Sequence, residues 1–299
     1  MNKKHIDVFE SHRPMLTAVA YQMLGERAEA QDLVQDTWEV WNSADRNNIK
    51  SPAAWLRTVI ARLSIDALRS AVKKREVYVG PWLPEPLIED VSLGPKEQFE
   101  MSKSCELALM WAMQRLSPQE RSAYILRKVF DCDYSELSLV LDKSESACRQ
   151  IVSRASKRIM DTNIRFDSSI QETGELLQCF AQACAANSHE QVLALLAPDV
   201  VSLSDGGGKV RAALRPLNGA AEVSKVLLST LLKYPPSEPV QVKIVNGLPA
   251  LVVAAERGEG MVCSVQADNS GRIAWIYIMR NPDKLKQGQS NSASAVCEK

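Results

Sequence analysis

The spacing of apolar residues divides the chain into three regions. From about residue 6 to residue 76, and again from about residue 98 to residue 160, apolar side chains recur every three or four positions, which predicts amphipathic helices. From about Val200 onward the pattern is typical of strands, and Asn246-Gly247 indicates a tight hairpin turn. We therefore predict a multidomain chain in which two all-α helical modules are followed by an α+β domain.

Prolines and polar stretches set the predicted boundaries. Pro81, Pro84, Pro86 and Pro95 interrupt any helix between the two helical modules, which indicates an extended linker. The polar, low-complexity stretch from Gln287 predicts a disordered tail. The predicted parts are a first helical module (1–76), a linker (77–97), a second helical module (98–162), a C-terminal domain (163–286) and the tail (287–299).

Two helices of the first helical module are predicted to carry opposite charges. The apolar positions of residues 30–41 define one buried side, which leaves acidic and polar residues on another side. Ser51-Pro52 predicts the start of the next helix. Between residues 50 and 75 seven residues are basic and only Asp66 is acidic, a density that favours a phosphate partner. The acidic face comprises Asp32, Gln35, Asp36 and Glu39, and the basic segment comprises Arg57, Arg62, Arg69 and Lys73.

The second helical module is predicted to contain a helix-turn-helix. Ser117 and Glu120 have the spacing of a capping box, and Asp133 with Glu136 repeats that signal at the start of a short helix. A tight turn at Asp142 and a second, longer helix follow, and in such motifs the second helix enters the major groove of DNA. The outward side of this helix, the recognition face, comprises Arg149, Gln150, Ser153, Arg154 and Lys157.

Whole-chain composition argues against several classes of protein. Basic and acidic residues number 36 each, so the net charge gives no indication of a partner. The chain has no apolar run long enough for a membrane span, and Asp7 interrupts the place of a secretory signal, so we expect a cytoplasmic protein. Seven cysteines without a C-x-x-C pair, together with only three histidines, favour neither disulfides nor zinc, and we expect no metal and no cofactor.

Several of these segments resemble a known family. Residues 30–38 (AQDLVQDTW), 55–62 (WLRTVIAR) and 66–69 (DALR) are similar to the second conserved region of extracytoplasmic-function sigma factors of bacterial RNA polymerase. Residues 116–121 (LSPQER) and the helix-turn-helix are similar to the fourth region, although Asp142 stands near the turn where family members commonly have glycine. Asp tolerates the left-handed conformation that such a turn requires. Residues 82–86 (WLPEP), 205–209 (DGGGK) and 281–285 (NPDKL) resemble the subgroup with a C-terminal SnoaL-like extension, which is an α+β cone.

The resemblance implies a function and two macromolecular partners. It implies an alternative sigma factor that directs core RNA polymerase to promoters and has no catalytic residues of its own. The acidic face would bind the core polymerase, the basic segment would bind the minus-ten element, and the recognition face would bind the minus-thirty-five element. The loop that would capture an extruded base of the minus-ten element comprises Asn47, Asn48, Ile49 and Lys50.

The three subgroup segments are predicted to form one regulatory contact. A free linker would expose the large aromatic ring of a tryptophan beside stiff prolines, so we expect this segment to dock on another part of the chain. Three consecutive glycines permit close approach of another chain segment. We expect the contact to hold the two helical modules in a set orientation, so that the C-terminal domain controls the sigma factor in cis. Its residues would be Trp82, Pro84, Glu85, Pro86, Asp205, Gly206, Gly207, Gly208, Lys209, Asn281, Pro282 and Asp283.

Two alternatives from other classes stay open at this point. The chain fits a stand-alone, ligand-responsive DNA-binding regulator, because cones of this kind can enclose a pocket for a small ligand. It also fits an enzyme of the cone fold fused to a DNA-binding module, for which Asp199, Asp205, Glu256 and Asp268 are the available carboxylates. No histidine–carboxylate pair stands out among them, so the enzyme hypothesis is the weaker one.

Overall fold

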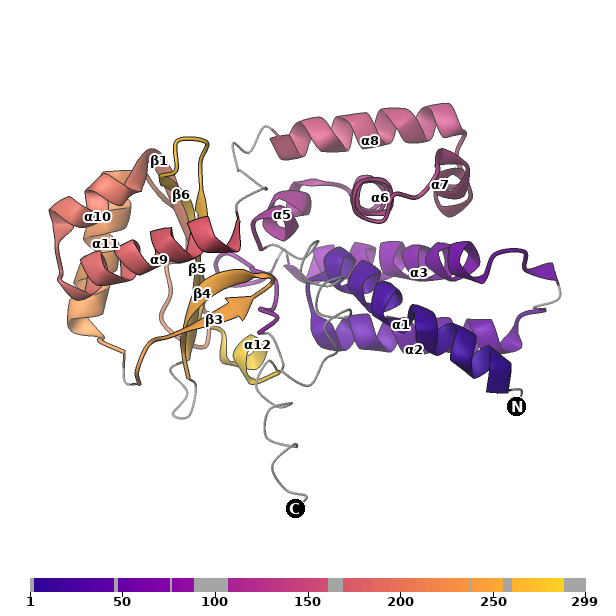
Figure 1. Ribbon diagram of the computed structural model, residues 1–299, viewed down its shortest axis with the longest axis horizontal. Helices are drawn as coiled ribbons and strands as arrows, with labels where there is room; N and C mark the ends of the chain where they lie inside the picture. The colour runs from indigo at the N-terminus through magenta and orange to yellow at the C-terminus, as the bar shows by residue number, and fades with distance from the viewer. Residues whose placement is uncertain are drawn as a thin grey trace, which may run out of the picture. The chain divides into compact units, whose positions relative to one another are not determined.

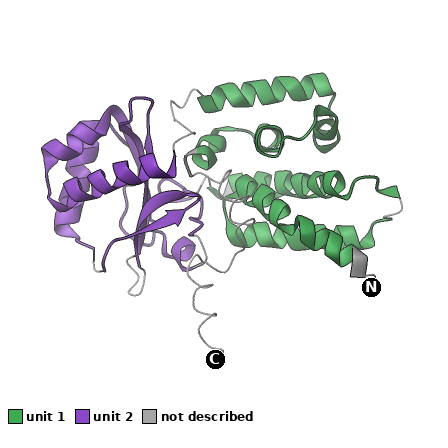
Figure 2. Cartoon of the chain, viewed as in Figure 1, with its two compact units in different colours: residues 1–76, 94–105, 109–162 green, residues 77–93, 106–108, 163–299 purple. Residues whose placement is uncertain are grey.

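The computed structural model describes residues 3–45, 48–75, 77–88, 107–160, 169–236, 238–254 and 260–287. These residues belong to two compact units (Figure 2). The first unit holds both helical modules, apart from Leu107 and Ala108, which are assigned to the second unit. The second unit holds the C-terminal domain together with residues 77–88 of the predicted linker. The predicted tail from residue 288 onward, Glu256 and Asn47 lie outside the described residues.

Three long helices build the first helical module (Figure 1): α1 (Lys3–Leu24), α2 (Arg27–Ser43) and α3 (Pro52–Arg75). Ala30, Val34 and Trp41 of α2 are buried, as the helical spacing predicts. The buried positions of α3 include Leu56, Ile60 and Leu68. The ring of Trp41 packs against Trp55 of α3 with 5.5 Å between ring centroids.

The second helical module contains α5 (Leu107–Ala112), a 3-10 turn (Met113–Arg115), α6 (Pro118–Tyr124), a π-helical turn (Ile125–Val129), α7 (Tyr134–Leu141) and α8 (Glu145–Met160). The predicted capping box forms at α6, where Ser117 and Glu120 satisfy each other's backbone amides. Asp133 is the N-cap residue of α7, as predicted, but its side chain makes no capping hydrogen bond. Asp142 adopts the left-handed conformation with φ 53°, as the tight turn between α7 and α8 requires.

A six-stranded sheet forms the centre of the C-terminal domain. Its strands are β1 (Leu196–Asp205), β2 (Leu217–Asn218), β3 (Gln241–Val245), β4 (Leu248–Val253), β5 (Met261–Ala267) and β6 (Ile273–Met279). The order across the sheet is β2-β1-β6-β5-β4-β3. Strands β3 to β6 form an antiparallel meander, and its first turn is the predicted hairpin, with Asn246 and Gly247 at φ 52° and 80°. Strand β1 pairs in parallel with β6, which places the end of β1 beside the end of β6.

Three helices cover one face of this sheet: α9 (Ile170–Ala185), α10 (His189–Leu195) and α11 (Ala220–Lys233) (Figure 1). The core between them contains Phe180, Val192 and Val223 from the helices, and Val265 and Ile276 from the sheet. A short helix, α12 (Pro282–Gln287), follows β6 directly. Helices on one face of a mostly antiparallel sheet confirm the predicted α+β class.

Candidate nucleic-acid interface and linker-docking site

The acidic face lies on the exposed side of α2. Asp32, Gln35, Asp36 and Glu39 are all exposed, while the opposite side of the helix packs into the first helical module. Three of these four side chains are carboxylates, and their spacing places them along one side of the helix. This geometry suits docking on a basic partner.

The basic segment of α3 is divided between solvent and internal contacts. Arg69 is exposed and pairs with Asp66 one turn earlier at 2.7 Å. Arg57 and Arg62 instead contact α7 of the second helical module. Lys73 lies in α3, although its side chain is outside what the structure describes.

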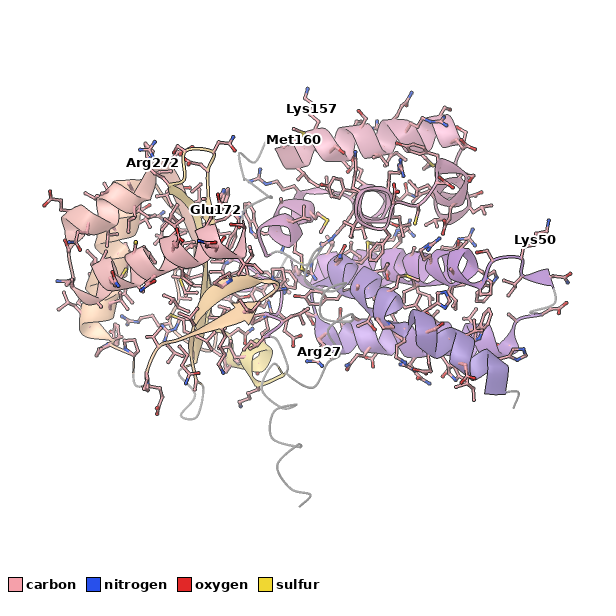
Figure 3. The ribbon with its side chains drawn as sticks, viewed as in Figure 1. Arg27, Lys50, Lys157, Met160, Glu172 and Arg272 are labelled. Atoms are coloured by element: carbon pink, nitrogen blue, oxygen red, sulfur yellow. The ribbon has the colours of Figure 1, made fainter. Side chains whose placement is uncertain are left out.

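The loop before α3 is described only in part. Asn48 Nδ2 donates a hydrogen bond of 2.8 Å to Asp45, and Lys50 is exposed at the end of the loop (Figure 3). Ile49 is half-buried. The described part therefore leaves Asn48 occupied by a local turn and Lys50 open to solvent.

The recognition face is exposed along one side of α8. Arg149, Gln150, Ser153, Arg154 and Lys157 are all solvent-accessible, and Lys157 projects outward from the helix (Figure 3). Arg149 pairs with Glu145 at 2.9 Å, and its guanidinium lies 4.9 Å from the ring centroid of Tyr134 in α7. Arg on such a surface can make bidentate contacts with guanine, whereas Lys suits phosphate.

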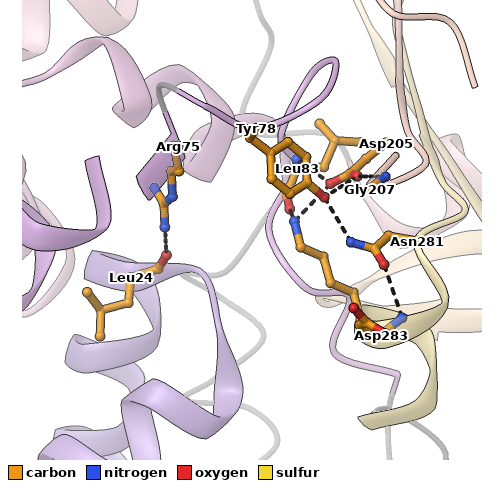
Figure 4. Close-up of polar contacts among 9 residues, drawn as sticks. Leu24, Arg75, Tyr78, Leu83, Asp205, Gly207, Asn281 and Asp283 are labelled. Atoms are coloured by element: carbon orange, nitrogen blue, oxygen red, sulfur yellow. Dashed lines mark hydrogen bonds and ion pairs between the residues drawn. The ribbon is translucent and has the colours of Figure 1, made fainter. Parts of the chain in front are cut away.

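Asp205 is the centre of a linker-docking site within the second unit (Figure 4). Its carboxylate is completely buried at the end of β1. It accepts hydrogen bonds from the Tyr78 hydroxyl at 2.6 Å and from the backbone amide of Leu83 at 2.9 Å, both in the linker. Gly207 N donates to the same carboxylate at 3.0 Å. A buried charge with several donors is well satisfied, so Asp205 fastens the linker to the sheet.

Lys284 supplies the opposite charge at this site. Its Nζ lies 2.8 Å from Asp205 Oδ2 and 2.5 Å from the carbonyl oxygen of Leu83. The ammonium group also lies 4.1 Å from the ring centroid of Trp82 and 5.2 Å from that of Tyr78. Lys284 is only 7% exposed, and its charge is compensated by the Asp205 carboxylate of β1 and by cation–π contacts with two aromatic rings of the linker.

The glycine segment leaves room for Asn281 and for the linker. Gly207 has φ 61°, and a Cβ placed there would lie 2.4 Å from Asn281 Nδ2. That nitrogen donates to the Tyr78 hydroxyl at 2.8 Å. Gly208 packs closely against Val79, with 3.2 Å from its ideal Cβ to the Val79 side chain. At the outer edge Lys209 pairs with Asp283 at 2.5 Å, where both side chains are more than half exposed.

The structure therefore brings together the three segments that resemble the subgroup. Trp82, Pro84, Glu85 and Pro86 are buried, as are Asp205 and Asn281. Sequence reasoning missed Tyr78 and Lys284, and it also missed the backbone amide and carbonyl of Leu83, which bond Asp205 and Lys284. The segment 281–285 contained Lys284, yet the sequence carries no signal that this lysine, rather than Lys286, points inward.

The linker also extends the sheet edge. Ile88 forms an antiparallel bridge with Val245 of β3. The amide of Leu87 donates to Asn246 Oδ1 at 3.0 Å, and the amide of Asn246 donates back to the Leu87 carbonyl at 2.8 Å. Residues 78–88 are thus bonded to the C-terminal domain near both ends, and the contact extends beyond segment 82–86, for which docking was predicted.

Two of the four carboxylates considered for an enzyme, Asp205 and Asp268, have other roles. Asp205 is occupied by the linker, and Asp268 accepts hydrogen bonds from Ser270 and from the amide of Arg272 in its own turn. Asp199 is exposed. A recess lined by Asn246, Ser264, Gln266 and Tyr277 has about 10 Å³ of free volume, enough for a single water. Within the described ranges, no group of three or more His, Cys, Asp or Glu is placed to hold a metal ion.

Membrane insertion receives no support from the described helices. None of them combines the length and the apolar character that crossing a bilayer requires.

Comparison with known families identifies the class of protein. Residues 8–74 match the family model of Sigma-70 region 2, and residues 106–159 match that of Sigma-70, region 4. The two matches cover the two helical modules, including the acidic face, the basic segment and the recognition face. The helical modules therefore define a sigma factor, the class that the resemblance predicts.

Whole-length relatives narrow the class to one family. "ECF RNA polymerase sigma factor SigJ" of Mycobacterium tuberculosis is 33% identical over 290 residues, which cover 94% of this chain and 93% of that protein. "Probable ECF RNA polymerase sigma factor SigI" of the same species is 25% identical and covers 93% of both chains. The crystal structure of SigJ superposes with a TM-score of 0.77 at 30% identity, covering 95% of this chain and 99% of that one. The chain belongs to the family of ECF RNA polymerase sigma factors, and the similarity to SigJ includes the C-terminal domain.

Proposed function

We propose that this sigma factor, which directs core RNA polymerase to promoters, is regulated in cis by its C-terminal domain through the docked linker. Membership of the family makes core polymerase and promoter DNA its partners and makes it a transcription factor rather than an enzyme. It would act in the cytoplasm, where these partners are. The single observation that carries the regulatory part is the buried Asp205 carboxylate, which binds linker residues Tyr78 and Leu83 directly.

The docked linker can affect promoter binding because it connects the two helical modules in the chain. The linker joins the two helical modules, and each module would have to reach its own promoter element. A linker that is bonded to a third domain at Asp205 and again at Asn246 restricts how far the two modules can separate. Release of the linker would remove this restriction and raise promoter binding.

We further propose the roles of the surfaces in the helical modules. The exposed acidic face would bind the core polymerase. The basic segment, with the loop at residues 47–50, would bind the minus-ten element, and the recognition face would bind the minus-thirty-five element. Their exposure and charge support these roles, with the exception of Arg57 and Arg62, which must first leave α7.

Tyr78→Phe tests the regulatory proposal with a single-atom change. The variant keeps the ring beside Lys284 but loses the hydroxyl that joins Asp205 to Asn281. A hydrogen bond to a charged group contributes about 1.5–3 kcal/mol, so the docked linker should be destabilised about tenfold or more. We expect faster amide exchange in residues 78–88 and more transcript from core polymerase on a promoter library.

Tyr234→Phe is the matched control. Its hydroxyl accepts a bond of 2.8 Å from Arg211 of the same domain, and this bond is exposed to solvent. We expect it to change neither amide exchange in the linker nor transcription. Regulation through the docked linker would be disproved if Tyr78→Phe accelerated exchange in the linker and left promoter output at the parent level. Absence of promoter-specific transcripts from every variant would instead contradict the sigma factor function.

A further inference from the structure

Two arginines of the basic segment are occupied by the second helical module. Arg57 Nε lies 2.7 Å from Glu136 Oε1, and a second guanidinium nitrogen lies 3.0 Å from Glu136 Oε2. The pair is bidentate and mostly sheltered, with side-chain exposures of 24% for Arg57 and 13% for Glu136. Farther along α3, Arg62 donates to the backbone carbonyl of Leu139. We call these interactions of α3 with α7 the α3–α7 contact.

Glu136 makes this contact in place of a local one. It stands in the first turn of α7, three residues after Asp133, where the sequence predicts a capping box. The helix nevertheless begins without a side-chain cap, and the Glu136 carboxylate reaches a residue 79 positions earlier in the chain. Helix α7 therefore lacks the stabilisation of a capping box, and the Glu136 carboxylate joins the two helical modules instead.

A second set of charged groups lies where the modules meet. Arg121 of α6 is 1% exposed, and its Nε donates a bond of 3.0 Å to the carbonyl of Gln22 near the C-terminus of α1. Arg75 donates to the carbonyl of Leu24 at the same helix end (Figure 4). The last carbonyls of a helix have no amide donors within that helix, and the two arginines bond two of them, those of Gln22 and Leu24.

Burial of these arginines opposes the closed arrangement. Desolvation lowers the pKa of Arg121 to about 9, and the neighbouring charge of Arg75 contributes to this lowering. A cation that is costly to bury favours separation of the two modules. The α3–α7 contact is an attractive interaction between the modules that offsets part of this cost.

We propose that Glu136 is an autoinhibitory residue that competes with promoter phosphate for Arg57. A guanidinium binds a carboxylate and a phosphate with the same pair of N–H groups, so the two ligands exclude each other. The proposal rests on the assignment of the basic segment to promoter DNA. Both partners of the contact belong to elements assigned to DNA, so one displacement frees α3 and the helix-turn-helix together.

Glu136→Gln tests the proposal in the full-length protein. The amide keeps the size of the side chain and loses the charge that competes with phosphate. We expect it to bind a promoter fork DNA about threefold to tenfold more tightly than the parent at moderate salt. Amide exchange in α7 should become faster, while the thermal unfolding curve shows that the variant is folded.

Asp66→Asn is the matched control for charge. It removes one negative charge from α3, and its partner Arg69 also belongs to the basic segment. Both side chains of this pair are more than half exposed, at 56% and 71%, so the pair is weak and competes little with phosphate. We expect less than a twofold change in DNA affinity and no change in α7 exchange.

A charge swap provides a second test. The double variant Arg57→Glu with Glu136→Arg re-forms the ion pair with its charges exchanged, so amide exchange in α7 should again be slow. It should bind DNA weakly, because the guanidinium is no longer on α3.

The outcomes separate the proposal from the function on which it rests. Equal DNA affinity for Glu136→Gln and Asp66→Asn, together with unchanged exchange in α7, would overturn the autoinhibitory contact itself. Faster exchange in α7 without tighter DNA binding would also overturn the proposal, and it would place the error in the assignment of Arg57 to promoter DNA. A restored contact in the exchanged pair that still bound DNA tightly would overturn the competition.

Discussion

Asp205 shows how a single buried carboxylate can join segments that are distant in sequence. Its charge is balanced by Lys284, and its oxygen atoms accept bonds from the linker and from Gly207. Removing one partner of such a buried pair leaves the other uncompensated, which typically costs several kcal/mol. The pair therefore makes docking specific for the linker geometry that supplies Tyr78 and the Leu83 amide.

Substitution of Gly207 should disrupt this site more than substitution of a comparable glycine. In Gly207→Ala the new Cβ would meet Asn281 at 2.4 Å and the residue would keep a positive φ. Gly271 has φ 78° and open space around its ideal Cβ, so Gly271→Ala reports the backbone strain alone. We expect Gly271→Ala to cost about 1 kcal/mol and Gly207→Ala about 2–4 kcal/mol in the free energy of unfolding of the C-terminal domain. Equal values from denaturant unfolding would show that the contact with Asn281 is not tight.

Cys263 should make stability depend on pH in the alkaline range. Burial raises the pKa of its thiol from 9.0 to about 12, with a further contribution from Cys184. The folded protein thus keeps the thiol protonated where the unfolded chain loses the proton. The corresponding stability is fully present below pH 9 and is lost as the pH rises toward 12, by an amount on the order of a few kcal/mol.

The measurement for Cys263 is the free energy of unfolding below pH 9 and again as the pH approaches 12. Cys263→Ala lacks the titrating group and should show a smaller decline over this range than the parent. Exposed Cys179 offers the control, because Cys179→Ala should retain the parent's decline. Equal declines for the parent and Cys263→Ala would contradict the assignment.

Among the elements, α2 has the surface with the most direct test. Asp32→Lys with Asp36→Lys reverses two exposed charges and leaves the buried Val34 and Trp41 untouched, so the fold should persist. We expect affinity for core polymerase to fall about tenfold or more at low salt, and less at high salt, because salt screens the lost attraction. The double change Glu175→Lys with Glu190→Lys, at exposed positions of the C-terminal domain, is the control for net charge. Equal core affinity for both double variants would remove the acidic face from the polymerase interface.

Local signals in the sequence predicted most of the elements but not their distant partners. The capping box at Ser117, the hairpin at Asn246-Gly247 and the exposed acidic face follow from spacing within a few residues. The parallel pairing of β1 with β6 and the pair Arg57–Glu136 join residues more than 70 positions apart, for which periodicity contains no information. At Glu136 the local signal was misleading, because a distant arginine outcompeted the helix's own amides.

Buried polar partners were the hardest part of the site to predict. The glycines and the tryptophan mark where segments approach closely, and the structure does bring those segments together. Tyr78 and Lys284 have unremarkable sequence neighbours, and their roles depend on a carboxylate more than 70 residues away. A lysine is far more often exposed than buried, so composition argues against the role that Lys284 has.

At the scale of the whole molecule, the C-terminal domain should act only through the linker. A chain that ends at Phe166 keeps both helical modules and the linker but loses Asp205, Asn281 and Lys284. In this truncated chain the linker has no docking site, so Tyr78 has lost its partners. We therefore expect Tyr78→Phe to raise transcription in the full-length protein and to have no effect in the truncated one.

Transcription with core polymerase is measured for the full-length and the truncated chain, each with and without Tyr78→Phe. These four values form a double-mutant cycle, which gives the coupling between the truncation and the Tyr78→Phe substitution. Helical content and cooperative melting of the truncated chain serve as the folding control. Two additive effects would mean that Tyr78 acts on the helical modules independently of the C-terminal domain. An effect of Tyr78→Phe that vanishes on truncation is what docking requires, because a hydroxyl whose partners are absent has nothing left to restrain.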